Sequence, residues 1–174
     1  MMRRIPIVQG EHAVVAEPGV IISTLLGSCV AVCLQDPVAR VGGMNHFLLG
    51  EPTEGLGDRV GQERYGVHAM ELLINRMMQQ GAARNRLRAH LYGGANIIAG
   101  LGAIGSSNAA FARRFMETEG IAVGRCELGG TKARKVEFMP YEGRVRSSVV
   151  ADAPPPVLNI KPLAPPDDGD VELF

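Results

Sequence analysis

The sequence lacks the features that mark membrane-spanning, secreted or nucleic-acid-binding proteins. Its 174 residues carry no net charge, with 18 Lys and Arg against 18 Asp and Glu, so no general attraction to nucleic acid or to an anionic membrane is expected. No stretch approaches the roughly 18 apolar residues of a membrane span. The basic N-terminus is not followed by the apolar core of a signal peptide. We therefore expect a cytoplasmic protein that is not inserted in a membrane.

Cysteine is also scarce, which limits the covalent chemistry of the chain. The three cysteines, Cys29, Cys33 and Cys126, are too few and odd in number for a disulfide framework. Cys29 and Cys33 have the spacing of half a metal site, but no second such pair exists. We expect no bound metal and no other cofactor, and we interpret Cys33 as a small buried apolar residue.

The chain is long enough for one domain with a substantial core. Residues 1–152 are predicted to form this domain, and the Pro-rich residues 153–174 a disordered tail or linker. Because residues 168–174 place acidic side chains beside apolar ones, a second interpretation of the tail is a tethered peptide that binds a partner. An unstructured end is as plausible as this, since such tails are commonly disordered.

Hydrophobic periodicity predicts strands that outnumber helices, hence an α/β domain with a mixed sheet, β-hairpins and two main helices. The predicted strands are 14–16, 20–22, 30–34, 41–49, 87–92, 121–123, 135–138 and 144–150. A polar loop is predicted over 50–63. The first helix is predicted to bury Val67, Met70, Leu73, Ile74, Met77 and Met78. The second is expected to be capped by Ser106, Ser107 or Asn108 and to end at Gly120.

A thiol and an imidazole are predicted to meet across the first hairpin. Asp36-Pro37 has the residues favoured at the start of a reverse turn over 36–39. In a symmetric hairpin, paired residue numbers would then sum to 75, which places Cys29 directly opposite His46 on one face. Directly opposite residues have Cβ atoms about 4.5–5.5 Å apart. The sequence therefore predicts contact between the two side chains.

A cysteine beside a histidine can act as a nucleophile with its base. Gly27 and Ser28 precede the thiol, and successive backbone N–H groups there can hold an oxyanion. A third group should orient the imidazole, and the nearby hydroxyls are those of Ser23 and Thr24. Taken singly, Cys29 and His46 are each more often packing residues. Their predicted pairing is what favours catalysis.

One further motif is weak. Gly100, Gly102 and Gly105 match the dinucleotide-binding fingerprint literally, but seven residues separate the pattern from the preceding strand. A flexible loop leading into a helix is the better interpretation.

Several segments in order resemble the CheD family of bacterial chemoreceptor glutamine deamidases. The nucleophile segment STLLGSCVAV (23–32) and the histidine segment GGMNH (42–46) carry the resemblance most closely. It continues through YGVHAMELLI (65–74), GGAN (93–96), IGSSN (104–108) and GGTKARKV (129–136). The resemblance covers about residues 10–150, and it departs at Ala133, where the family usually has Gly.

The resemblance implies a layered α/β sandwich that hydrolyses selected glutamine side chains of methyl-accepting chemotaxis receptors to glutamate, with release of ammonia. The family's nucleophile and base fall on Cys29 and His46, which implies a thioester on Cys29. The family's third catalytic residue, a Thr six positions before the Cys, falls on Ser23, while Thr24 stands beside it. The resemblance also implies the cytoplasmic domains of chemoreceptors as substrate and the phosphatase CheC as a further partner.

Two other functions remain open at the level of sequence. A CheD-like protein with weak catalysis would act mainly as a binding module for receptors or a phosphatase. A general thiol peptidase would share Cys29 and His46, although nothing beyond this pair favours it.

Overall fold

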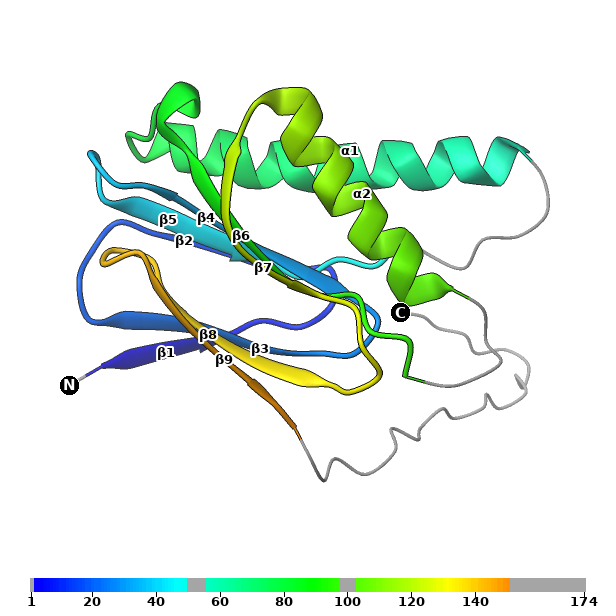
Figure 1. Ribbon diagram of the computed structural model, residues 1–174. Coiled ribbons are helices and arrows are strands. Elements are labelled where there is room, and N and C mark those ends of the chain that lie inside the picture. The colour runs from blue at the N-terminus through cyan, green and yellow to red at the C-terminus, as the bar shows by residue number, and fades with distance from the viewer. Residues whose placement is uncertain (1, 50–55, 98–102, 151–174) are drawn as a thin grey trace, which may run out of the picture.

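The computed structural model describes residues 2–49, 56–97 and 103–150, which form three stacked layers (Figure 1). A four-stranded sheet, a five-stranded sheet and a layer of two helices lie one above the other, with the five-stranded sheet in the middle. The predicted layered α/β fold with two main helices and hairpins is therefore confirmed. The predicted tail, 153–174, lies outside the described residues.

Both sheets are mixed. The strands of the five-stranded sheet are β2 (His12–Val15), β4 (Val30–Asp36), β5 (Val41–Asn45), β6 (Arg88–Gly93) and β7 (Ala122–Leu128). They lie in the order β2-β5-β4-β6-β7, and only β6 and β7 are parallel. The strands of the four-stranded sheet are β1 (Arg3–Pro6), β3 (Val20–Leu26), β8 (Arg134–Met139) and β9 (Arg144–Val149). Their order is β1-β3-β8-β9, with β1 and β3 parallel.

The middle sheet has an apolar core on each face, and the central strand β4 contributes to both. Val30, Val32 and Leu34 pack in the cluster shared with the helices. Ala31 and Cys33 alternate with them and pack in the cluster between the two sheets. A strand buried on both faces reads as a continuous apolar run, which is how residues 30–34 appear in the sequence. Cys33 is 1% exposed, in agreement with its predicted packing role.

Helix α1 (Leu56–Gln79) begins earlier and buries a narrower stripe than predicted. The predicted loop over 50–63 is wrong from residue 56 onward, and residues 50–55 lie outside the described part. Met70, Leu73, Ile74 and Met77 are buried, but the predicted core residues Val67 and Met78 are 42% and 37% exposed. They lie at the margins of the face that packs on the sheet. The prediction from periodicity alone therefore included more residues in the buried face than the structure does.

Helix α2 (Ile104–Glu119) also starts before its predicted cap. Ala103 is the N-cap residue and forms no side-chain capping bond, while Ser106, Ser107 and Asn108 all lie inside the helix. The predicted end is confirmed, because Gly120 adopts the left-handed conformation (φ 69°) that favours glycine at this position. Neither α1 nor α2, as far as their residues are described, is long and apolar enough to cross a bilayer.

The turn between β4 and β5 is longer than the sequence predicts. Cys33 pairs with Met44 and Asp36 with Val41, so paired numbers sum to 77 and not to 75. The carboxylate of Asp36 accepts the N–H groups of Val38 and Ala39, and the chain continues through Arg40 at φ 59° before pairing resumes. The turn therefore holds two more residues than predicted, Ala39 and Arg40. The left-handed backbone of Arg40 was not predicted, since such conformations favour glycine.

Asp36 ties this turn to a neighbouring loop. Its side chain is fully buried, accepts the Ala83 N–H at 2.8 Å and forms an ion pair with Arg86 at 2.8 Å. Although burial opposes the charge, these hydrogen bonds hold the pKa of Asp36 well below its usual range.

Replacing Asp36 by asparagine is expected to lower the free energy of unfolding at pH 7 by about 2–4 kcal/mol, because Arg86 loses its buried partner. A carboxyl with a depressed pKa stabilises the fold above its unfolded pKa of about 3.9, and that stabilisation disappears as the pH falls through the folded pKa. Urea unfolding at pH 7 and at pH 3 measures both effects. The matched control is Glu17→Gln, which breaks a solvent-exposed pair with Arg3 and should cost under about 1 kcal/mol. Equal losses in the two variants would contradict the prediction.

Candidate active site

The hairpin places Cys29 and His46 on one face but not directly opposite each other. With paired numbers summing to 77, Ala31 lies opposite His46, and Cys29 lies two residues farther along its arm. A register change of two residues keeps every side chain on its face, because side chains alternate with a period of two. The predicted direct pairing is therefore wrong, whereas the predicted shared face is retained. Diagonal neighbours of this kind are about 7–8 Å apart at Cα.

The ladder between the two arms is interrupted next to this pair. Regular pairing ends at Cys33 and Met44, and a single bridge then joins Val30 to Phe47. Between them, the Val32 N–H donates to the side-chain oxygen of Asn45 at 3.0 Å, in place of a backbone carbonyl. The asparagine amide therefore separates the arms locally.

The backbone of His46 bonds to the other side of this arm, where it continues the pairing of β5 with β2. Its N–H donates to the Glu11 carbonyl at 3.1 Å, and its carbonyl accepts the Gly10 N–H at 2.8 Å. These bonds hold the histidine against the connection between β1 and β2. The same connection brings the Gln9 side chain to the thiol, with 3.8 Å between Cys29 Sγ and Gln9 Oε1.

Thr24 on β3 fixes the orientation of the imidazole. Its Oγ1 lies 2.7 Å from His46 Nδ1 and also 2.7 Å from the carbonyl oxygen of Ile7. A hydroxyl has one proton, and the carbonyl can only accept, so Thr24 donates to Ile7. Thr24 must then accept from His46, which places the proton on Nδ1 and leaves the lone pair on Nε2. The unprotonated nitrogen is the one available as a base.

Ser23, the predicted orienting residue, lies on the other face of β3. Successive strand side chains point to opposite faces, and Thr24 is buried toward the middle sheet while Ser23 is only partly buried. Ser23 therefore cannot make the contact that Thr24 makes. The difference from the prediction follows from the contact between β3 and the residue after β5, which the order of residues along the chain does not reveal.

Burial keeps both candidate catalytic groups neutral. Cys29 and His46 are 8% and 6% exposed. Desolvation raises the pKa of Cys29 to about 11 and lowers the pKa of His46 to about 4, the latter partly offset by the Glu11 carboxylate. At pH 7 the pair is therefore a thiol and a neutral imidazole, so the thiol needs a base to become a nucleophile.

The segment before the thiol is held by three consecutive carbonyl bonds. The Gly27 carbonyl accepts the Ala95 N–H at 3.0 Å, and the Cys29 carbonyl accepts the Gly94 N–H at 2.8 Å. Between them, the Ser28 carbonyl accepts the side-chain amide of Asn108 at 2.8 Å. The predicted support residues Gly27 and Ser28 are thus fixed from the side of β6 and α2.

Sequence reasoning missed Asn45 and Asn108 as residues that shape this site. Both lie in segments that carried the CheD resemblance, but Asn45 was given no role and Asn108 only that of a possible helix cap. Asn45 is 3% exposed and Asn108 is fully buried. The signal that could have found them is a polar residue inside a buried strand or helix face, because a buried amide needs hydrogen-bond partners.

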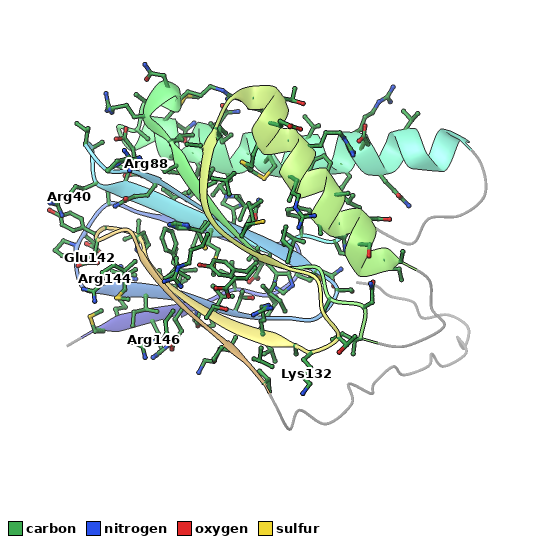
Figure 2. The ribbon with its side chains drawn as sticks, viewed as in Figure 1. Arg40, Arg88, Lys132, Glu142, Arg144 and Arg146 are labelled. Atoms are coloured by element: carbon green, nitrogen blue, oxygen red, sulfur yellow. The ribbon has the colours of Figure 1, made fainter. Side chains whose placement is uncertain are left out.

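Other candidate sites are separate from this one. A cavity of about 370 Å³ lies between the sheets at the far end of β4, lined by Gln35, Arg88 and His90 among others. Figure 2 shows Arg40, Arg88 and Arg144 at that end of the sheets. No group of three His, Cys, Asp or Glu side chains in the described ranges is arranged to hold a metal ion. The weak fingerprint at residues 100–105 falls partly outside the described residues.

Comparison with known proteins identifies the family. A family profile described as "CheD chemotactic sensory transduction" matches residues 48–148, a range that begins after Cys29 and His46. A Zymomonas mobilis protein named "Probable chemoreceptor glutamine deamidase CheD" is 49% identical over 99% of this chain and 93% of its own. A Caulobacter vibrioides protein of the same name is 48% identical over 98% and 93%. A Neisseria meningitidis crystal structure of family DUF152 is similar at a TM-score of 0.49 and 14% identity, and the match covers 84% of this chain and 74% of that one. By its close relatives over nearly its whole length, the chain belongs to the CheD family.

Proposed function

We propose that this protein is a chemoreceptor glutamine deamidase that uses Cys29 as nucleophile, His46 as base and Thr24 to orient the histidine. Two relatives whose sequences are 49% and 48% identical to this chain carry that name. The observation that carries the proposal is the Thr24–His46 bond, which leaves the imidazole lone pair on Nε2, on the face that also holds Cys29. The substrate is the cytoplasmic part of a chemoreceptor, so the enzyme acts in the cytoplasm.

In the first half of the reaction, His46 Nε2 takes the thiol proton as Cys29 Sγ attacks the carboxamide carbon of a receptor glutamine. The tetrahedral oxyanion is stabilised by backbone N–H groups next to the thiol. The imidazolium then protonates the leaving nitrogen, and ammonia departs from a γ-glutamyl thioester on Cys29.

In the second half, His46 takes a proton from water as the water attacks the thioester. The C–S bond breaks, the proton returns to sulfur, and the product is glutamate. A neutral thiol and a neutral imidazole at rest are suited to this cycle, because each half begins with proton transfer to the base.

The rate of deamidation should depend on pH in a way set by this burial. Because the pKa of His46 is lowered to about 4, kcat/KM is expected to stay level from about pH 9 to about pH 5 and to fall toward pH 4, when the lone pair is protonated. A solvated histidine would lose activity already near pH 6.5. Initial rates measured by mass spectrometry of a receptor fragment test this, and an acid limb centred near 6.5 would contradict it.

Acid unfolding must be separated from the loss of the base. A histidine whose folded pKa lies below its unfolded value stabilises the fold above pH 6.5, and this contribution decreases as the pH falls toward 4. Circular dichroism across the same pH range is therefore the control, and only rates at pH values where the protein is folded are compared.

The competing functions are separated by one measurement on a receptor cytoplasmic fragment. A deamidase adds about one dalton per modified glutamine, a thiol peptidase cleaves the backbone, and a binding module leaves the mass unchanged. Binding of the phosphatase CheC is a separate proposal that rests on the family resemblance, and a pull-down with purified CheC tests it.

A further inference from the structure

Asn108 on α2 bonds to the backbone on both sides of the candidate site, next to Cys29 and shortly after His46. Its side-chain nitrogen donates to the Ser28 carbonyl at 2.8 Å, and its side-chain oxygen accepts the Leu49 N–H at 3.0 Å. Ser28 immediately precedes Cys29, and Leu49 follows His46 by three residues. A fully buried amide with both of its ends bonded has a fixed orientation.

The bond to Ser28 also sets the direction of the Cys29 N–H. The Ser28 carbonyl and the Cys29 N–H belong to one peptide unit, and a trans unit points them to opposite sides. By the same geometry, the bond from the Ala95 N–H to the Gly27 carbonyl directs the Ser28 N–H. The Gly27 and Ser28 carbonyls both point toward β6 and α2, so the N–H groups of Ser28 and Cys29 point away from these two elements.

The Ser28 and Cys29 N–H groups take no part in the bonds that hold this segment. Within the described ranges, neither the Ser28 N–H nor the Cys29 N–H donates to an acceptor. The next unit differs, because the Val30 N–H donates to the Phe47 carbonyl at 3.0 Å. Two adjacent free N–H groups at a nucleophile are the usual composition of an oxyanion hole.

Close packing holds Asn108 against this segment. An added Cβ on Gly105 would lie 2.2 Å from the Ala95 carbonyl oxygen, and one on Gly94 would lie 2.9 Å from the Ala109 Cβ. The first turns of α2 thus approach the loop after β6 as closely as glycine allows. A displaced helix would not bring the amide to Ser28.

We propose that Asn108 is a positioning residue. By bonding to the Ser28 carbonyl it orients the Cys29 N–H toward the substrate carbonyl, so that this N–H can serve in an oxyanion hole. This inference rests on the proposed function, in which an oxyanion forms at the glutamine carbon. Asn108 itself touches no reacting atom. Its effect should therefore appear in reactions that pass through an oxyanion and be absent from those that do not.

The test compares two reactions of Cys29 in the full-length protein. Acylation by p-nitrophenyl acetate passes through a tetrahedral oxyanion, whereas alkylation by iodoacetamide is a direct displacement at carbon. Asn108→Ala is expected to lower the acylation rate at least tenfold and the alkylation rate less than threefold, because misaligned groups lose rate even when they remain present. The deamidation kcat should fall like the acylation rate, with KM little changed.

Asn108→Asp is the conservative variant, and it allows the same comparison of rates if Asn108→Ala does not fold. When ionised, its carboxylate still accepts the Leu49 N–H but cannot donate to Ser28. When protonated, its O–H can donate again, so the ratio of acylation to alkylation should rise as the pH is lowered. In wild type this ratio should stay level, because both reactions need the same thiolate.

The matched control is Ala112→Gly, which weakens α2 at a buried position without touching either Asn108 bond. If Ala112→Gly changes the ratio of the two rates as Asn108→Ala does, or if neither Asn108 variant changes it, the inference is overturned. A wild-type protein that is acylated at Cys29 but does not deamidate receptor fragments would instead overturn the proposed function and leave the role of Asn108 standing.

Discussion

Cys29→Ala should reduce ammonia release from a receptor cytoplasmic fragment by a factor on the order of 10³ or more, because the proposed acyl intermediate forms on the Cys29 sulfur. The fold should persist, since the change removes one sulfur atom at the end of the cluster between the sheets. Mass spectrometry of the receptor fragment measures the loss. Equal deamidation by wild type and variant would remove Cys29 from the mechanism.

The other two cysteines provide controls of matched chemistry. Cys126 is exposed on β7, so Cys126→Ala should leave both activity and stability unchanged. Cys33 is buried on the same face of the hairpin as Cys29, so Cys33→Ala should lower stability slightly and keep activity. This comparison separates loss of a nucleophile from loss of a buried thiol.

The second large effect is expected at Thr24. Thr24→Val keeps the side-chain shape and removes the hydroxyl, so His46 Nδ1–H loses its acceptor and the tautomer with a free Nε2 is no longer favoured. We expect kcat for deamidation to fall about 100-fold, with KM within about threefold, because the base acts after the substrate is bound. Single-turnover deamidation rates measure this directly.

Two neighbouring variants make this prediction specific to the hydroxyl of Thr24. Thr24→Ser retains the hydroxyl and should keep activity within about threefold. Ser23→Ala removes a hydroxyl on the opposite face of β3 and should also change kcat by less than about threefold. A larger loss for Ser23→Ala than for Thr24→Val would assign the orienting role to Ser23, as the family motif implies.

The difference between Ser23 and Thr24 illustrates a general limit on transferring a motif by counting. The distance in sequence from the nucleophile depends on the number of residues in the turn between β3 and Cys29. One residue more or fewer exchanges the two faces of the preceding strand. In the proposed mechanism the orienting residue must contact His46, and Thr24 Oγ1 lies 2.7 Å from His46 Nδ1.

Local patterns in the sequence determined most elements of this protein, because hydrophobic periods of 2 and 3.6 and the turn residues Asp36 and Gly120 act over a few neighbours. They did not predict the short strand β1 (Arg3–Pro6) or the starts of the two helices. They also determined that Cys29 and His46 share a face, since an error of two in the register preserves the face. The tertiary structure alone decided which side chains contact His46 and the backbone next to the pair. Thr24, Asn45 and Asn108 act across contacts between strands, sheets and layers. Such contacts depend on how distant segments pack, and local periodicity contains no information about that packing.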